Sequence, residues 1–368
     1  MASSNYRVRG DGDLPPFSKL LVADRGAAAV RVIRAAHELG IETVAVHSVR
    51  DSRAYHVRLA DEAVCIGPED PRLSYGQMFN VLSAATTAGC DALHPGRSPL
   101  AYRAAFAEMC EKVGVQFVGP RVETLRLLED SAAIRSTLEG AEVDLAPEGT
   151  PTAFEVPILF DSHGNVIALP SIAEHRSSGD HLVFESPARA SAGTLERAWS
   201  EAIKAVRALD FVGACSVSFG EIGGLALVKG LAPIMKRTYA SAERASGSDV
   251  VKEQIRIAAG EPLSFSDDDL RRDRFVVGCS VVAEEGHDRP VESLYISRGN
   301  GLRWDGAAQE GDVLGPEAGP LGDLIANGRT REEAFARLRH ALAASEVTGP
   351  RVDFATLVAA VDEAEEVL

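Results

Sequence analysis

Apolar strands and helices alternate along the first third of the chain, and this alternation constrains the fold more than any other feature. The expected strands cover residues 19–26, 41–48, 60–67, 90–96 and 115–119, and the expected helices cover 27–40, 75–89 and 101–114. Strands separated by helices of this length need crossover connections, so they pair in parallel. The pattern predicts a parallel sheet with helices on both faces.

The rest of the chain follows a different pattern. Residues 154–169 hold two short strand patterns around a Ser-His-Gly-Asn turn, which is typical of a hairpin. A second strand pair is expected at 213–220 and 224–230, a further strand at 274–285, and helices at 195–210, 248–260 and 330–345. Strand pairs mixed with helices predict an α+β region on a partly antiparallel sheet.

Composition excludes several classes of function. The chain has 368 residues and a net charge of −16, and its acids are spread along its length. Nucleic acid or an anionic membrane would need a clustered basic face, so neither is expected as a partner. No apolar run approaches the ~20 residues of a membrane span, and the polar N-terminus lacks the apolar core of a signal peptide, so a cytoplasmic location is expected.

Cysteines and histidines do not indicate a metal centre. No C-x-x-C, H-x-x-x-H or H-E-x-x-H spacing occurs among them. We therefore expect no zinc site, and we expect reduced thiols, mostly in the core, at Cys65, Cys90, Cys110, Cys215 and Cys279.

Several separate segments resemble one family, the biotin carboxylases, which are the ATP-grasp components of acyl-CoA carboxylases. They are "FSKLLVADRGAAAVRVIRAAHELGIETVAVHS", "HVRLADEAVCIGP", "DALHPG", "FVGPRVETLRLLED" and "DVVKEQIRIAAGEPL", with "GLRWDG" and "TREEAFARLRHAL" resembling the C-terminal portion. The match keeps its order from about Phe17 to about Ala344.

The resemblance implies an α/β fold of biotin-carboxylase type, with an N-terminal parallel-sheet domain, an α+β ATP-grasp remnant without its lid module, and a C-terminal α+β domain. The expected boundaries are a polar tail at 1–16, the N-terminal domain at 17–130, a remnant that replaces the lid at 131–154, a truncated ATP-grasp domain at 155–268 and the C-terminal domain at 269–368.

The family's nucleotide-binding residues are replaced at several positions. Ser131 stands where the family has a phosphate-binding lysine, and a hydroxyl does not supply that positive charge. Only 23 residues separate Ser131 from Glu155, too few for the glycine-rich lid, and Leu145–Ala146 match the pair that contacts adenine. The two Mg²⁺ carboxylates match Ser218 and either Lys229 or Gly230, and a lysine would repel the metal.

The family segment that deprotonates bicarbonate, "R-I-Q-V-E-H-P", matches "IMKRTYA" here. Ile234 replaces its arginine, Thr238 its glutamate and Tyr239 its histidine, so the base is missing. In the opposite wall, "H-P-G-Y-G-F-L-S-E" becomes "HPGRSPLAY".

Arg303 in "GLRWDG" matches the family arginine that stabilises the charge on biotin and bicarbonate. The same residue has a structural interpretation, stacking on Trp304 or pairing with Asp305. Glu155 matches a family carboxylate, although a strand residue that faces solvent is the simpler expectation for it. A residual basic cleft is expected from Lys229, Lys236, Arg237 and Arg303.

The first-domain helix keeps Arg31, Arg34 and Glu38, where the family packs a second protomer. Their spacing puts them on one helix face, which indicates either a dimer interface or an ordinary solvated surface.

Three functions remain open. The chain is a catalytically inactive homologue acting as a structural or regulatory subunit, or a protein whose opened basic cleft binds an anionic small molecule, or a working ATP-dependent carboxylase. On the first interpretation it binds no ATP, Mg²⁺ or biotin, and it forms a homodimer or pairs with an active biotin carboxylase or another acyl-CoA carboxylase subunit. The chain has no M-K-M motif, so it does not carry biotin itself.

Overall fold

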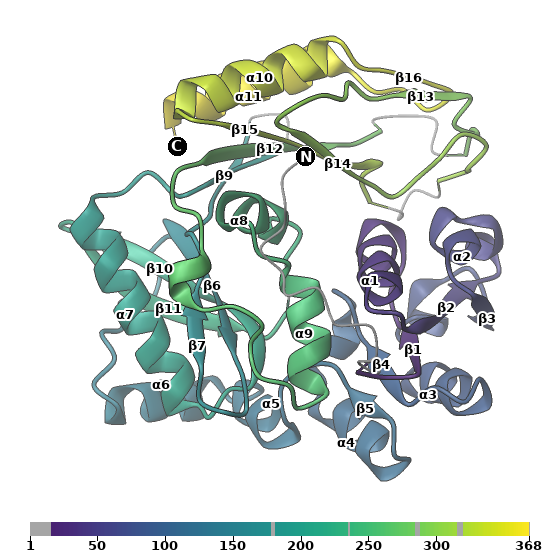
Figure 1. Ribbon diagram of the computed structural model, residues 1–368, viewed down its shortest axis with the longest axis horizontal. Helices are drawn as coiled ribbons and strands as arrows, with labels where there is room; N and C mark the ends of the chain where they lie inside the picture. Colours follow the sequence, from purple (N-terminus) through teal and green to yellow (C-terminus); the bar gives the residue numbers. More distant parts are fainter. Residues whose placement is uncertain (1–15, 178–180, 235, 284–287, 315–318, 368) are drawn as a thin grey trace.

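The structure is a computed structural model, and it describes residues 16–177, 181–234, 236–283, 288–314 and 319–367. The expected polar tail at 1–16 lies almost wholly outside the described residues. These described residues form three main sheets and a small two-stranded one. Figure 1 shows the first sheet and its helices on one side of the molecule and the two antiparallel sheets beside and above it.

The first sheet is parallel, as predicted. Its strand order is β3-β2-β1-β4-β5, and every neighbouring pair runs in parallel. The strands are β1 (Lys19–Val22), β2 (Glu42–Ser48), β3 (Glu62–Gly67), β4 (Ala92–His94) and β5 (Gln116–Phe117).

Helices cover both faces of this sheet because successive strand residues point to opposite sides. Leu20 and Val22 pack on the side of α1 (Gly26–Glu38), whereas Leu21 and Val44 pack on the side of α3 (Met78–Thr87) and α4 (Ala104–Lys112). The short helices α2 (Tyr55–Leu59) and α5 (Val122–Leu128) complete this part of the chain.

The second sheet is antiparallel and contains both predicted strand pairs. Its strand order is β11-β10-β6-β7. The apolar face of the sheet packs against helix α7. The elements are α6 (Ser131–Gly140), β6 (Phe154–Phe160), β7 (Val166–Ala168), α7 (Ala192–Ala208), β10 (Gly213–Ile222) and β11 (Leu225–Ala232).

The third sheet, of order β14-β15-β12-β9-β8, joins two segments that are far apart in the sequence. Strands β8 (Ala173–Arg176) and β9 (Leu182–Ser186) come before the expected boundary at 268/269, and β12 (Phe275–Val281) pairs with β9 across it. The remaining members are β14 (Leu302–Gly306) and β15 (Gly322–Gly328), while β13 (Ser293–Tyr295) and β16 (Glu346–Thr348) pair separately.

Helices also enclose the third sheet. Figure 1 shows α10 (Arg331–Ala343) and α11 (Phe354–Val367) above it and α8 (Tyr239–Ser246) below it. Helix α9 (Val250–Ala258) lies at the centre of the molecule and contacts both α1 and the second sheet. The ends of α1, α8, α9 and β14 therefore meet between the three sheets. Within the described ranges, no helix is long and apolar enough to cross a bilayer.

Candidate functional site

A small cavity lies where the three sheets meet. Its volume is about 40 Å³, and most of its charged lining is basic. The lining comes from the start of α1, the loop after β4, the segment after β11, and α8, α9, β14 and β15. Three of the four residues expected in a basic cleft, Lys236, Arg237 and Arg303, line this cavity, and Arg31 and Arg97 join them. Sequence reasoning did not place Arg97 here.

Lys229 lies outside the cavity. It is an exposed residue of β11, and its Nζ donates to Thr152 Oγ1 at 2.6 Å. It does not line the cavity, so the four residues expected in the cleft do not form one site.

Arg303 is held by two carboxylates. Its Nε and Nη2 donate to the two oxygens of Asp305 at 2.7 and 2.8 Å, and its Nη1 donates to Glu243 Oε2 at 3.0 Å. Although burial opposes the charged form, Asp305 and Glu243 raise the pKa of the guanidinium. The ion pair expected from the sequence is present, and Glu243 adds a second one.

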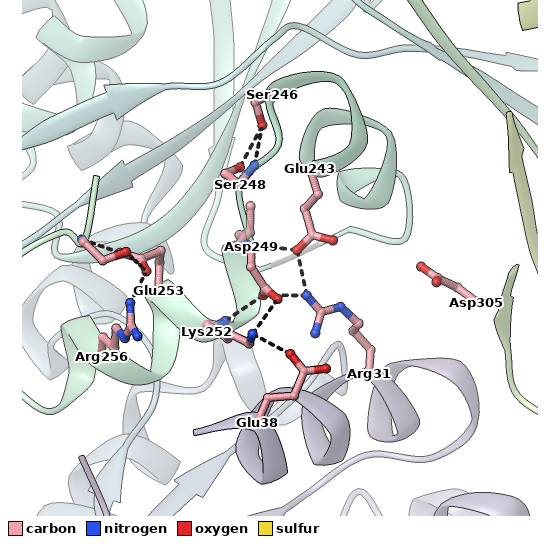
Figure 2. Close-up of polar contacts among 12 residues, drawn as sticks. Arg31, Glu38, Glu243, Ser246, Ser248, Asp249, Lys252, Glu253, Arg256 and Asp305 are labelled. Atoms are coloured by element: carbon pink, nitrogen blue, oxygen red, sulfur yellow. Dashed lines mark hydrogen bonds and ion pairs between the residues drawn. The ribbon is translucent and has the colours of Figure 1, made fainter. Parts of the chain in front are cut away.

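Arg31 belongs to the same network (Figure 2). It extends from α1 towards Glu243 and Asp249, and its Nη2 lies 3.1 Å from Glu243 Oε1. Asp249 also caps α9 by accepting from the Lys252 amide, and the Lys252 side chain pairs with Glu38. Arg31 and Glu38 thus tie α1 to α8 and α9 inside the chain, while Arg34 remains exposed and donates to the Tyr55 hydroxyl at 3.0 Å. The dimer interface assigned to Arg31, Arg34 and Glu38 stays a prediction.

Glu155 does not face solvent, and that expectation is wrong. It is 5% exposed, and it accepts from Ser216 Oγ at 2.8 Å and Ser218 Oγ at 3.2 Å. Lys236 forms an ion pair with it. Residues 216 and 218 share a face of β10, and Ser218 lies opposite Glu155 in the β10–β6 register, so three polar groups converge on one carboxylate.

Arg237 and Asp323 form a second buried pair, and the sequence analysis did not identify Asp323. Arg237 donates from Nη1 to Ser280 Oγ at 3.0 Å, and Ser280 donates to Asp323 Oδ1 at 2.6 Å. Burial raises the pKa of Asp323 to about 6, against the lowering effect of Arg237. An acidic residue within the mostly apolar strand "GDLIANG" was the available signal, because such a residue needs a partner when the strand is buried.

Thr238 follows Arg237, and it is the residue that the sequence resemblance matched to the family's bicarbonate base. It is buried, and its Oγ1 donates to Glu174 Oε1 at 2.9 Å. A threonine hydroxyl does not accept a proton from bicarbonate near neutral pH, so this position holds no general base. Among the described residues, no group of three or more His, Cys, Asp or Glu side chains is arranged to hold a metal ion. The five cysteines are free, and all but Cys65 are buried.

Comparisons with known proteins agree with this fold. Residues 16–125 match the family model for the biotin carboxylase N-terminal domain, and residues 149–266 match the ATP-binding domain of the carbamoyl-phosphate synthase L chain. Biotin carboxylase 1 of Bacillus subtilis is 30% identical over 90% of this chain and 92% of its own length. The chloroplastic biotin carboxylase of Arabidopsis thaliana is also 30% identical, over 90% of this chain and 76% of its own.

Solved structures of the same fold include free-standing and multifunctional carboxylases. Biotin carboxylase from Campylobacter jejuni, solved as a beta-gamma-ATP complex, has a TM-score of 0.88 at 21% identity, and the match covers 95% of this chain and 96% of that one. The biotin carboxylase domain of Hydrogenobacter thermophilus 2-oxoglutarate carboxylase, solved with MgADP, ADP and bicarbonate, has a TM-score of 0.86 at 26% identity and 94% coverage of both chains. Against the complete pyruvate carboxylase of Rhizobium etli, the TM-score is 0.87 at 27% identity, and the match covers 94% of this chain but only 39% of that one.

The expectation that this chain binds no ATP, Mg²⁺ or biotin is wrong as a deduction from the sequence. Residues 149–266 match an ATP-binding domain as a whole, and the similar structures include one solved with MgADP. Replacement of single side chains removes individual contacts, whereas a nucleotide is also held by backbone groups and by the shape of the domain.

Proposed function

Because this chain belongs to the biotin carboxylase family, we propose that it is a structural or regulatory subunit that does not turn over bicarbonate, and that it acts in or beside an acyl-CoA carboxylase complex. The observation that carries the proposal is Thr238 at the position of the bicarbonate base. Its hydroxyl is buried and bonded to Glu174, so it offers no lone pair of suitable basicity to a substrate proton.

The neighbouring charges support the same proposal. Lys236 is paired with Glu155, and Arg303 is shared between Asp305 and Glu243. A guanidinium already held by two carboxylates has little charge left to stabilise an anion that develops during a reaction. The charged groups that remain at the junction therefore bind one another and hold the fold.

The short connection before β6 is a further support. The alignment with the Bacillus subtilis relative spans 417 positions although it uses only 90% of a 368-residue chain. The alignment is therefore longer than the part of this chain that it contains. The additional positions are residues of the relative that have no counterpart in this chain. Helix α6 ends at Gly140 and β6 begins at Phe154, and this short connection supports our inference that the lid module is absent here.

A turnover assay tests the proposal. The purified full chain would be incubated with ATP, Mg²⁺, bicarbonate and free biotin, and the release of ADP that depends on both bicarbonate and biotin would be measured. We expect no release above the protein-free rate, whereas the Bacillus subtilis relative in the same assay serves as the positive control. Nucleotide binding would be measured separately by calorimetry, since a bound nucleotide without turnover agrees with a regulatory subunit. Release of ADP in proportion to the protein added would refute the proposal.

A copurification experiment tests the partner. A tagged chain expressed in its native host should carry carboxylase subunits with it, or a second copy of itself. Capture of neither would remove the basis for a role in a carboxylase assembly.

A further inference from the structure

A second cavity lies between the edge of the first sheet and the second sheet. Its volume is about 210 Å³, larger than that of the cavity where the three sheets meet. The lining comes mainly from α4, from the edge strand β5 and the loop after it, from the start of β10 and from α9, in the lower part of Figure 1. Among the described residues none lines both cavities, so this one is a separate site.

The buried part of the lining is mostly apolar. It includes Ala107, Phe117, Ala214 and Ile257, each at most 4% exposed. The polar side chain among these buried lining residues is Gln254, which lies beside His94 of β4. One water needs roughly 10–15 Å³ on this measure, so the cavity has room for an organic molecule of about ten heavy atoms. Its apolar lining favours a ligand with a hydrocarbon group.

The exposed part of the lining carries one charge of each sign. Glu111 lies in the last turn of α4, and its carboxylate has no hydrogen bond or ion pair with any residue that the structure describes. Arg121 pairs with Asp210 at 2.7 Å, but the two side chains are 49% and 81% exposed. Water screens such a pair, so the guanidinium can also bind the carboxylate of a ligand. A ligand with one positive and one negative group would match both residues.

We propose that this cavity binds a free α-amino acid with an apolar side chain. Glu111 pairs with the α-ammonium group, Arg121 binds the α-carboxylate, and the side chain of the ligand packs against Phe117 and Ile257. An amino acid carries both charges on one carbon, so it presents them to the exposed lining while its side chain leaves water. The inference goes beyond the proposed function, which requires neither this ligand nor this cavity.

The bound amino acid would join two parts of the chain. Glu111 and Phe117 belong to the region of the first sheet, whereas Ile257 belongs to α9. The ligand therefore holds α4 and β5 against α9. Because these surfaces separate on unfolding, the ligand binds only the folded chain, and the unfolding midpoint should rise with ligand concentration.

Calorimetric titration of the full chain with L-phenylalanine and L-leucine tests the inference. We expect a Kd on the order of 1 mM, as for a ligand of this size, and a matching rise in the thermal unfolding midpoint. Three comparison ligands each lack one feature. Glycine has no side chain, N-acetyl-L-phenylalanine has no ammonium group, and L-phenylalaninamide has no carboxylate. Each should bind at least about tenfold more weakly than L-phenylalanine.

Two variants locate the binding. Glu111→Gln should raise the Kd for phenylalanine about tenfold but leave that for N-acetylphenylalanine unchanged, because this ligand has no charge for Glu111 to meet. Arg121→Gln should do the same for phenylalanine and phenylalaninamide. The matched controls are Arg135→Gln and Glu139→Gln, which break an exposed pair on α6 and should leave every Kd unchanged.

Three results would each overturn the inference. The first is no heat of binding at about 10 mM phenylalanine or leucine. The second is glycine binding as tightly as phenylalanine, since the apolar lining would then play no part. The third is an unchanged Kd for phenylalanine in either Glu111→Gln or Arg121→Gln.

Discussion

Arg303 of β14 donates to Glu243 of α8 across 3.0 Å, and the other oxygen of Glu243 accepts from Arg31 of α1 at 3.1 Å. One buried carboxylate therefore joins the first domain to the C-terminal sheet. Its third acceptor contact, with the Val250 amide at 2.9 Å, also fixes the start of α9. The relative placement of three parts of the chain depends on this residue.

Glu243→Gln should destabilise the fold by about 3 kcal/mol or more, because it leaves two buried guanidinium groups partly unpaired. The matched control is Glu69→Gln, which breaks an exposed pair with Arg50 and should cost about 0.5 kcal/mol or less. Urea denaturation of both variants at pH 7 measures the difference. Equal costs would mean that the Glu243 network does not hold the parts together.

Gly96→Ala should destabilise the fold more than Gly114→Ala. Both glycines have positive φ, +60° and +76°, so the backbone strain of the substitution is similar. A Cβ at Gly96 would lie 2.3 Å from Asp24 Oδ2, whereas one at Gly114 meets nothing within 4 Å. Asp24 holds the Arg97 amide at 2.6 Å, so it cannot move freely.

We expect Gly96→Ala to cost ~1–3 kcal/mol more than Gly114→Ala, as for an overpacked site. Thermal unfolding of the two variants provides the measurement. Identical unfolding midpoints of the two variants would show that the Asp24 side chain moves aside without a loss of stability.

Acid should weaken the fold through His56 and His94. Burial lowers the pKa of each imidazole to about 4, below the usual 6.5. The folded state therefore holds fewer protons than the unfolded chain between these values, and the stability that each neutral imidazole contributes is lost as the pH falls from 6.5 through 4. For one histidine the loss between pH 7 and pH 5 is ~2 kcal/mol.

His56→Gln isolates this contribution, since its pH dependence should be flatter than that of the wild type over this range. His340→Gln, at an exposed position, should keep the wild-type slope. Asp323 contributes with the opposite sign, because its raised pKa gives stability at low pH that is lost as the pH rises through about 6. The measurement is the free energy of unfolding of each variant at pH 5, 6 and 7. The same dependence on pH in the wild type and in His56→Gln would contradict the prediction.

Arg34→Glu should shift a dimer towards monomer without unfolding the chain. Among the residues that the structure describes, the polar and ring contacts of Arg34 are with the Tyr55 hydroxyl and ring, so its charge is available to a partner. An interface of about 1,600 Å² in which charged pairs fix the register is sensitive to a reversed charge. Light scattering at micromolar concentration measures the mass, and Arg135→Glu on α6 is the control. A wild type that is strictly monomeric would rule out this interface.

The sequence by itself determined the elements of the fold and the family. The strands and helices of the first sheet and the hairpin of β6 and β7 were predicted because each depends on a local period and on its own turn. The match of Thr238 to the family's bicarbonate base comes from comparing motifs position by position, and it stays a prediction. The same comparison failed for the cofactors, because a nucleotide-binding domain is more than its individual side chains.

Only the tertiary structure decided which charges are satisfied. Glu155 is buried because Lys236 reaches it from a segment 81 residues away, and Arg31 meets Glu243 across 212 residues. Local periodicity says which face of a strand or helix a residue occupies, but not what covers that face. The cover depends on how α1, α8, α9 and β14 pack together, and this packing brings Arg303 and Arg31 to the same buried acid, Glu243.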